Sequence, residues 1–429
     1  MATAESLAHE LRSRGWNAIA SLLNVTVEGR EISGTWVCEI DDDNQHQPVD
    51  VNVYHYGPNG HVWQAGTTTH EARASLPKTP LGVRRIAGAE THCRDGGMAT
   101  TQTRLGDSLK PNNAGVVFAR NPALGPTVAL LIAIAFFSIA TNTFFNIDNF
   151  SAVVNQTTVI GALALGQTPI ILTAGIDLAN AAIAVFGTIL ITQLVSGGLP
   201  SPIGLAVGIV ACGAIAMVSG LLVTQLRLPP FIVTLGMLAV MTAVTNLYSG
   251  GTTHPVPEGL LTWLGTQTYL FGGIPMTYGM GVTAILFAIT WAALAKTAWG
   301  RHVYAIGDDP ESARFTGINV RVNLVSVYIV AGIIYGFAAW IAMGRTPTAD
   351  PNAYQTGNLD SITAVVIGGT SLFGGRGGVA GTIIGALIVA VLRSGLTQMG
   401  IDSNYQNLAT GVLVIAAVAF DQLTRRRMS

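Results

Sequence analysis

The sequence contains little charge. Only 10% of its 429 residues are Asp, Glu, Lys or Arg, whereas 50% are hydrophobic. A soluble domain typically carries about 25% charged residues, so this composition favours a membrane protein. The net charge of −1 and the absence of a basic stripe predict that the protein has no nucleic-acid partner. The three cysteines, Cys38, Cys93 and Cys212, are too few and too scattered to predict a disulfide framework or a metal site.

Lysine is scarce as well, which excludes one route to ATP. None of the three lysines, Lys78, Lys110 and Lys296, ends a G-x-x-x-x-G-K-[ST] pattern, so the chain has no P-loop. Beyond residue 97 no Ser/His/Asp or Cys/His set is evident, and we therefore expect no catalytic residue. No predicted span carries an ionisable residue at its centre, which disfavours proton coupling. A transporter driven by another subunit, a passive channel and a scaffold remain.

The charge is concentrated at the start of the chain. Residues 1–97 hold 8 of the 22 Lys and Arg and 12 of the 23 Asp and Glu. Helical spacing over 5–23 and alternating stretches such as ISGTWVCEI predict a small soluble α+β segment. No basic start precedes an apolar core, so no signal peptide is predicted. Three readings of this segment stay open. It is an extension of unknown role, or a regulatory module that binds a cytoplasmic ligand, or it is not part of the biological protein because translation begins at Met98.

The rest of the chain contains repeated apolar runs of membrane-spanning length. Residues 98–123 read as a cytoplasmic leader, and 124–424 as an all-α polytopic membrane domain of about ten segments. The eighth is glycine-rich and expected to be short or broken. The predicted segments are 124–144, 149–176, two within 177–227 divided by SGGLPSP at 196–202, one starting at 228, then 278–296, 322–344, 361–375, 377–398 and 404–422.

Positive charge supports this count. With the N-terminus placed inside, twelve of the fourteen Lys and Arg residues beyond residue 97 fall in inside segments, as the positive-inside rule requires. Only Arg345 falls in an outside loop, and Arg393 lies near the outer end of the ninth segment. The pattern predicts a multi-pass membrane protein with both termini in the cytoplasm.

Four stretches resemble a known family. They are LTAGIDLA (172–179), LPPFIVTLGM (228–237), GRHVYAIGDDPESARFTGINV (300–320) and ITAVVIGGTSLFGGRGGVAGTIIGALI (362–388). Together they resemble the permease subunits of bacterial ABC importers for monosaccharides of the ribose, xylose, arabinose and fructose group, and the wording is most like the fructose-type members. The resemblance covers residues 120–425 and not residues 1–97.

The resemblance implies a fold, partners and cofactors. The chain would have the ABC importer permease fold and work as one of two permease copies, most simply a homodimer, in the lipid of the bacterial inner membrane. A separate ABC ATPase subunit would carry the ATP and magnesium, and this chain would hold no cofactor. A periplasmic or lipid-anchored binding protein would deliver the sugar. The alternative is a channel or facilitator for small polar solutes that works alone.

The charged stretch at 307–319 is the predicted coupling site. Asp308 or Asp309 is suited to cap a short helix over 310–316, Pro310 to its first turn, and Gly317 to the position just past its end. In the resembled family this part of the inside loop, 297–321, contacts the ATPase, and Glu311, Ala313 and Gly317 match the contact pattern. The predicted coupling residues are Asp308, Asp309, Pro310, Glu311, Ser312, Ala313, Arg314 and Gly317. An ordinary capped turn is the simpler alternative.

Two further elements are candidate hinges or gates. Gly175 and Asp177 precede the third span, where Asp177 either caps a helix or belongs to a broken membrane segment. Gly374, Gly375 and Arg376 lie in a glycine-rich inside turn that is either a plain turn or a second ATPase-facing element.

Polar residues within the spans are candidates for the sugar path. They are Asn155, Gln156, Gln167, Thr234 and Asn246. Each has an alternative role in a hydrogen bond between helices.

Overall fold

The computed structural model describes residues 17–28, 31–42, 45–51, 54–56, 62–64, 124–270 and 274–428. The chain divides into two compact units, Met1–Asp107 and Ser108–Ser429. The predicted leader, 98–123, lies outside the described residues.

The first unit contains strands. β1 (Asn17–Glu28), β2 (Glu31–Asp42) and β3 (Gln45–Val51) form an antiparallel sheet in that order, and β4 (Tyr54–Tyr56) pairs with β5 (Val62–Gln64). The alternating stretch ISGTWVCEI lies within β2, as predicted. The helix predicted over 5–23 is wrong from Asn17 on, because β1 begins there. Its β-branched run of Val25, Thr26 and Val27 pairs along β2, and this pairing outweighs the helical spacing.

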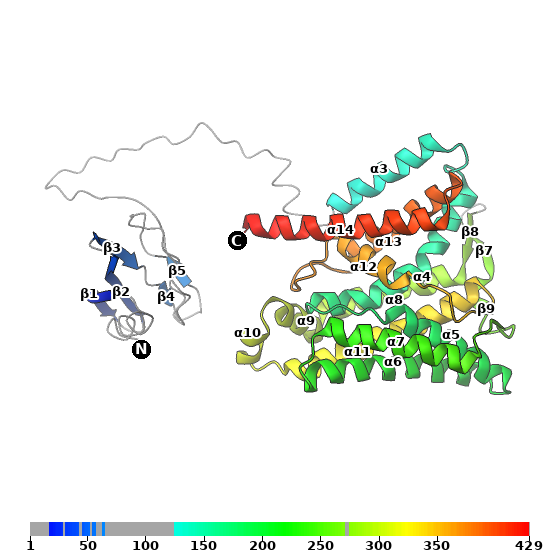
Figure 1. Ribbon diagram of the computed structural model, residues 1–429, viewed down its shortest axis with the longest axis horizontal. Coiled ribbons are helices and arrows are strands. Elements are labelled where there is room, and N and C mark those ends of the chain that lie inside the picture. The colour runs from blue at the N-terminus through cyan, green and yellow to red at the C-terminus, as the bar shows by residue number, and fades with distance from the viewer. Residues whose placement is uncertain are drawn as a thin grey trace. The chain divides into compact units, whose positions relative to one another are not determined.

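The second unit is helical (Figure 1). Each of the ten predicted apolar segments overlaps one of the following helices: α3 (Leu124–Ala140), α4 (Ile147–Leu172), α5 (Asn180–Ser196), α6 (Ser201–Gln225), α7 (Pro230–Ser249), α8 (Tyr278–Lys296), α11 (Val320–Arg345), α12 (Gly357–Ile367), α13 (Val379–Gln398) and α14 (Ser403–Met428). In the described part of the chain, five helices, α6, α7, α8, α11 and α13, are long and apolar enough to cross a membrane. The protein is thus a polytopic, mostly helical membrane protein.

The eighth segment is short, as predicted. α12 has 11 residues and ends at Ile367, whereas the apolar run continues to 375. Gly369 adopts a left-handed backbone with φ of +88°, so the helix cannot continue through it. Residues 368–378 therefore form a turn that leads into α13.

The centre of the bundle is α11. It packs against α6, α4 and α5, and a continuous face of it is buried, including Tyr328 and Tyr335. Glycine makes this close packing possible: a Cβ atom on Gly332 would lie 2.6 Å from the carbonyl oxygen of Cys212 on α6.

The two ends of the bundle carry different elements (Figure 1). At one end, α9 (Ala298–Asp308) and α10 (Pro310–Phe315) join α8 to α11. At the opposite end, the loops contain β6 (His254–Pro255), the 3-10 turn η1 (Trp263–Gly265), β7 (Gln267–Leu270), β8 (Ile274–Thr277) and β9 (Thr348–Ala349). β6 pairs with β9 and β7 with β8, so this end is also structured.

Candidate coupling site

The short helix α10 begins at a capping aspartate. The Asp309 carboxylate accepts hydrogen bonds from the Glu311 N–H at 2.9 Å and from the Ser312 hydroxyl at 2.6 Å. These bonds, that of Ser312 first, lower the pKa of Asp309 below its ordinary value of 3.8. Of the two aspartates that the sequence offered, Asp309 is therefore the cap, and Asp308 is the last residue of α9.

The same helix ends at a glycine. Gly317 has a left-handed φ of +88°, and the N–H of Ile318 donates back to the carbonyl of Ala313 at 3.1 Å. This arrangement is a Schellman motif, which closes a helix and satisfies its last carbonyls. The helix predicted over 310–316 is confirmed to within one residue at its end.

α10 presents one aromatic ring to solvent. Its charged residues Glu311 and Arg314 are exposed, and Phe315 is 89% exposed. Ala313, by contrast, is buried, so its side chain faces the protein. Phe315 was absent from the sequence prediction, although an aromatic residue in an otherwise polar loop is a signal that could have identified it.

The end of α9 joins two other breaks of the chain. A Cβ atom on Gly307 would lie 1.8 Å from the carbonyl oxygen of Leu172 and 2.6 Å from the nitrogen of Gly375. The N–H of Gly375 itself donates to that Leu172 carbonyl at 2.9 Å. Gly374 and Gly375 both have left-handed backbones. Three segments that were predicted separately thus meet in direct backbone contact, which we call the glycine junction (Gly307, Leu172, Gly374 and Gly375).

The break between α4 and α5 begins at this junction. Residues 173–179 are not helical, and Ala174 takes a left-handed φ of +60°, which costs a residue with a Cβ atom about 1 kcal/mol or more. Asp177 is buried, and its carboxylate accepts from the Ala179 N–H at 2.8 Å. Asp177 therefore lies within a broken segment, as one of the two readings of the sequence expected, and its side chain does not cap α5, whose N-cap residue is Ala179.

Two of the predicted path residues brace this break. Both Gln167 and Thr234 are fully buried. With its amide oriented to satisfy both atoms, Gln167 donates to the Asp177 carbonyl at 3.1 Å and accepts from its N–H at 3.0 Å. The Thr234 hydroxyl donates to the carbonyl of Ile176 at 3.0 Å. In this conformation the polar side-chain atoms of Gln167 and Thr234 are thus hydrogen-bonded to the backbone of the break.

The sequence matches the family described as "Branched-chain amino acid transport system / permease component" over residues 149–418. The chain belongs to this permease family. The match includes every element of the glycine junction and α10. No solved structure gives a significant match.

Curated relatives of this permease are sugar import permeases. It is 40% identical over 313 residues to the fructose import permease protein of Rhizobium meliloti, covering 71% of this chain and 87% of the relative. It is 36% identical over 303 residues to the ribose import permease protein of Bacillus subtilis, covering 70% and 92%. It is 32% identical over 318 residues to the galactose/methyl galactoside import permease protein of Escherichia coli K12, covering 71% and 95%.

In the permease, the first turns of α5 and α12 lie against each other. The Asn180 amide donates to the Ser361 hydroxyl at 2.6 Å, and the Asn358 amide donates to the carbonyl of Leu178 at 3.3 Å. Both Asn180 and Ser361 are fully buried. The break that starts at the glycine junction is thereby tied to the short helix α12.

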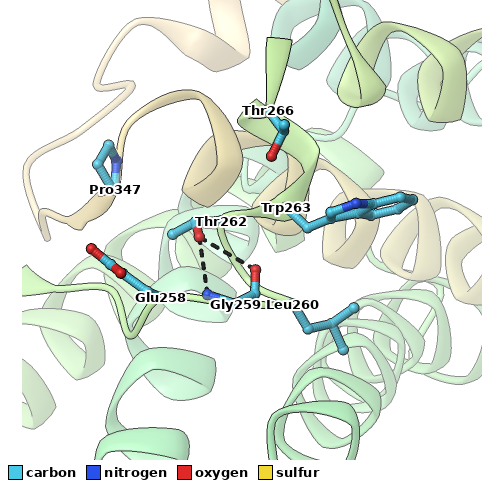
Figure 2. Close-up of a pocket in the computed structure, with 7 residues that line it drawn as sticks. All are labelled: Glu258, Gly259, Leu260, Thr262, Trp263, Thr266 and Pro347. Carbon is cyan, nitrogen blue, oxygen red and sulfur yellow. Dashed lines mark hydrogen bonds between the residues drawn. The ribbon is translucent and has the colours of Figure 1, made fainter. Parts of the chain in front are cut away.

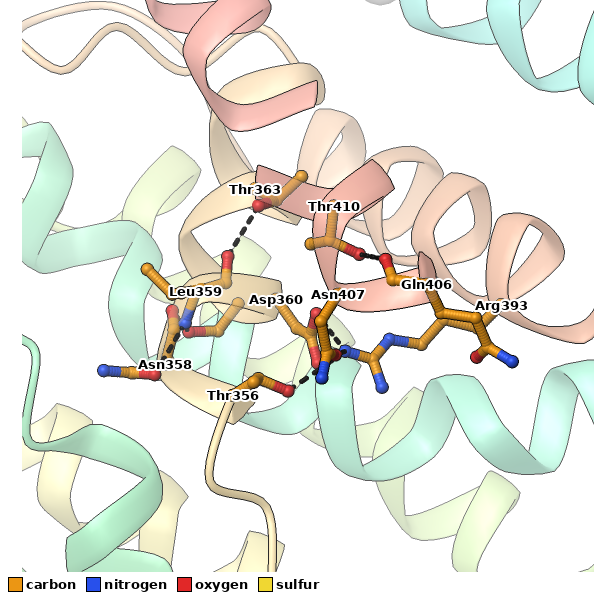
Figure 3. A network of polar contacts seen from close by, with 10 residues as sticks. Thr356, Asn358, Leu359, Asp360, Thr363, Arg393, Gln406, Asn407 and Thr410 are labelled. Carbon is orange, nitrogen blue, oxygen red and sulfur yellow. Dashed lines mark hydrogen bonds and ion pairs between the residues drawn. The ribbon is translucent and has the colours of Figure 1, made fainter. Parts of the chain in front are cut away.

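α12 is held at its other side by an ion pair that the sequence did not predict (Figure 3). Arg393 of α13 lies 2.8 Å from the carboxylate of Asp360, and its guanidinium also donates to Thr356 and to Asn407 of α14. The Arg393 side chain is 18% exposed and that of Asp360 is 4% exposed. The pair thus joins α12, α13 and α14.

The remaining candidates are more exposed. Asn155, Gln156 and Asn246 are half-buried, and the Asn246 amide donates to the carbonyl of Thr242 in its own helix. Arg376 is exposed next to the glycine junction.

Proposed function

We propose that this permease is the membrane-spanning subunit of an ABC importer that carries a monosaccharide into the cell. Its curated relatives import fructose, ribose and galactose, so a neutral pentose or hexose is the proposed cargo. A separate ATPase subunit, with its ATP and magnesium, drives the transport. A periplasmic or lipid-anchored sugar-binding protein supplies the sugar, and two copies of the chain form a homodimer in the lipid membrane.

The glycine junction is the observation that carries the proposed mechanism. α10 is a capped helix with an exposed aromatic ring, which is suited to a groove on a partner protein. The helix before it contacts the α4–α5 break and the α12–α13 turn through backbone atoms, with no flexible side chain between them. Because packed backbone is not continuously deformable, a displacement of α10 reaches both breaks. In this proposal Gly175, Asp177, Gly374, Gly375 and Arg376 act as the hinge, and α10 receives the force.

We also propose the orientation of the chain. The inside loops carry twelve Lys and Arg residues, so the end of the bundle with α9 and α10 is cytoplasmic and the end with η1 and β7–β8 is external. In this topology ten helical segments cross or enter the membrane, and both termini are cytoplasmic. The domain then covers 124–424, the coupling loop 297–321, and residues 1–97 are a cytoplasmic extension or lie upstream of a start at Met98.

Reconstitution tests the proposal. The chain, its partner ATPase and its binding protein are placed in proteoliposomes, and uptake of fructose, ribose and galactose is measured with and without ATP. ATP-dependent uptake of one sugar is expected, and Gly317→Glu is expected to abolish it while the chain remains in the membrane. Uptake that needs neither ATP nor the partner would instead support a facilitator that works alone.

The N-terminal segment is tested in the same system. Deletion of residues 2–97 with unchanged uptake and regulation would contradict a regulatory role. Detection of a peptide from 1–97 in the native protein by mass spectrometry would exclude a start at Met98.

A further inference from the structure

We propose that the pocket around Trp263 is an external docking site for a neutral monosaccharide, separate from the coupling site. This inference rests on the proposed function, which makes this end of the bundle external and a sugar its cargo. The pocket is an open cavity of about 780 Å³ (Figure 2), and its lining residues are Glu258, Gly259, Leu260, Thr262, Trp263, Thr266 and Pro347.

The floor of the pocket is fixed by the bundle. Leu261 and Leu264 alternate with its lining residues and are fully buried. The indole N–H of Trp340 on α11 donates to the carbonyl of Leu260 at 3.0 Å. A Cβ atom on Gly265 would lie 1.8 Å from the carbonyl oxygen of Gly344, so the 3-10 turn rests directly on the end of α11. A preformed cavity loses little conformational entropy when a small ligand binds.

Trp263 provides an aromatic platform. Its ring stacks on Tyr278 with centroids 4.7 Å apart and planes inclined by 17°, and it is still 45% exposed. The stack holds the ring in one orientation. A pyranose or furanose ring has an apolar face of C–H groups, and an aromatic surface that is rigid and partly open to water offers that face a place to pack.

Glu258 provides the matching polar group. It is exposed at the cavity on the other side of Thr262 from Trp263 (Figure 2), and it forms no ion pair with the described residues. An ionised carboxylate accepts hydrogen bonds on two oxygens, which suits the adjacent hydroxyl groups of a sugar. An anionic ligand would be repelled, and in the described residues no group of three acidic, His or Cys side chains offers a cation site. The chemistry therefore favours a neutral polyol.

The pocket also joins two external loops. Pro347, on its far wall, belongs to the loop that precedes α12, and its carbonyl accepts from the N–H of Val256 at 3.1 Å. A ligand in the pocket would therefore contact the loop that leads to α12.

The test uses the full chain assembled with its partners in lipid nanodiscs. Acrylamide quenching of tryptophan fluorescence is measured while D-fructose, D-ribose or D-galactose is titrated, with glycerol as an osmotic control. We expect one sugar to protect a saturable fraction of the fluorescence, with half of the effect at a millimolar concentration, as befits a small ligand on an open site. Trp263→Phe should remove this protection. Trp291→Phe is the matched control, because Trp291 is 49% exposed and belongs to α8 near Lys296.

A second variant, Glu258→Gln, tests the affinity of the pocket for the sugar without changing the buried residues beneath the pocket. Glu258→Gln should raise the half-effect concentration about fivefold or more, and circular dichroism should be unchanged because the side chain is exposed. Protection that survives Trp263→Phe, or no protection by any sugar in a complex that transports one of them, would overturn the proposal and leave Trp263 as a membrane-interface aromatic residue only. If the complex transports none of the sugars but Trp263 is still protected, the docking site stands and the proposed transport function fails.

Discussion

Gly307 and Leu172 are in direct backbone contact. A Cβ atom on Gly307 would lie 1.8 Å from the Leu172 carbonyl oxygen, the same oxygen that accepts the N–H of Gly375. The last turn of α9 therefore lies on the end of α4 with no side chain between them. This contact makes the proposed coupling loop and the α4–α5 break parts of one rigid junction.

Gly307→Ala is the sharpest test of this junction. The added methyl group cannot be accommodated without a backbone shift, and overpacking of this kind costs about 1–3 kcal/mol. We expect the variant to insert in the membrane and to bind the ATPase, but to lose at least tenfold in ATP-dependent uptake. Uptake and ATP hydrolysis are both measured in proteoliposomes, because a broken linkage leaves hydrolysis without transport.

Gly236→Ala is its control. Gly236 lies within α7, and nothing lies within 4 Å of the position of its Cβ atom. Alanine is the better helix former, so uptake and thermal stability should stay the same or rise slightly. Equal losses in the two variants would contradict a special role for the junction.

The cap of α10 should matter for coupling. Asp309→Ala removes the acceptor for the Glu311 N–H and the Ser312 hydroxyl, whereas Asp309→Asn keeps an acceptor oxygen. We expect uptake to fall severalfold in the alanine variant and to stay near normal in the asparagine variant. If the asparagine variant loses as much uptake as the alanine variant, the negative charge of Asp309 matters and not its hydrogen bonds.

The same cap predicts a pH dependence. The pKa of Asp309 is lowered in the folded protein. The stabilisation of α10 by the ionised carboxylate is therefore fully present at pH values above 3.8, the ordinary pKa, and is lost as the pH falls through the lowered pKa. Hydrogen exchange of the α10 amides, corrected for intrinsic rates, should give a constant protection factor between about pH 5 and 8. A loss of protection near pH 6 would contradict this assignment.

Phe315 should act through a partner and not through the fold. Because its ring is 89% exposed, Phe315→Ser removes almost no buried surface, and the thermal stability of the isolated chain should be unchanged. Co-purification of the ATPase should drop at least tenfold, since aromatic residues dominate the energy of such interfaces. Phe315→Leu should retain part of the binding. Normal co-purification of the serine variant would show that the ATPase does not use this ring.

Local rules of sequence predicted the helices better than their ends. Both ends of α8 were predicted to the residue, because the apolar run follows Gly272, Gly273 and Pro275 in the sequence and ends at Lys296. The second segment was predicted to 176, but α4 ends at Leu172. Residues 173–176 continue the uncharged run but are non-helical, and hydropathy alone does not show where within such a run a helix ends.

The candidate site was predictable in its parts and not in its assembly. Capping rules identified Pro310 and Gly317 and narrowed the cap to Asp308 or Asp309, since each acts within a few residues of its own helix. The meeting of Gly307 with Leu172 and Gly375 is a contact between distant parts of the chain, and no local pattern encodes it. Arg393 was interpreted only through its charge for the same reason, because its partner Asp360 precedes it by a whole helix.

The ion pair between Asp360 and Arg393 gives a last prediction. Since Asp360 is nearly completely buried, Arg393→Gln leaves its carboxylate without a cation. Removing one member of a buried pair typically costs 3–5 kcal/mol, and the partial exposure of Arg393 lowers our expectation to about 2–3 kcal/mol. Thermal unfolding of the purified permease should show this loss for Arg393→Gln.

The double variant Asp360→Asn, Arg393→Gln separates an ion pair from mere packing. Neither amide carries a charge, so no buried ion remains unpaired, and the double variant should be more stable than Arg393→Gln alone. Losses that simply add would mean that the two side chains are energetically independent despite their 2.8 Å contact. Thr356 and Asn407 bond to the same guanidinium, so part of the loss should persist in the double variant and represent the link between α12 and α14. If uptake falls further than stability in these variants, α12 takes part in transport, because the residue next to Asp360, Ser361, ties the same turn of α12 to the α4–α5 break through Asn180.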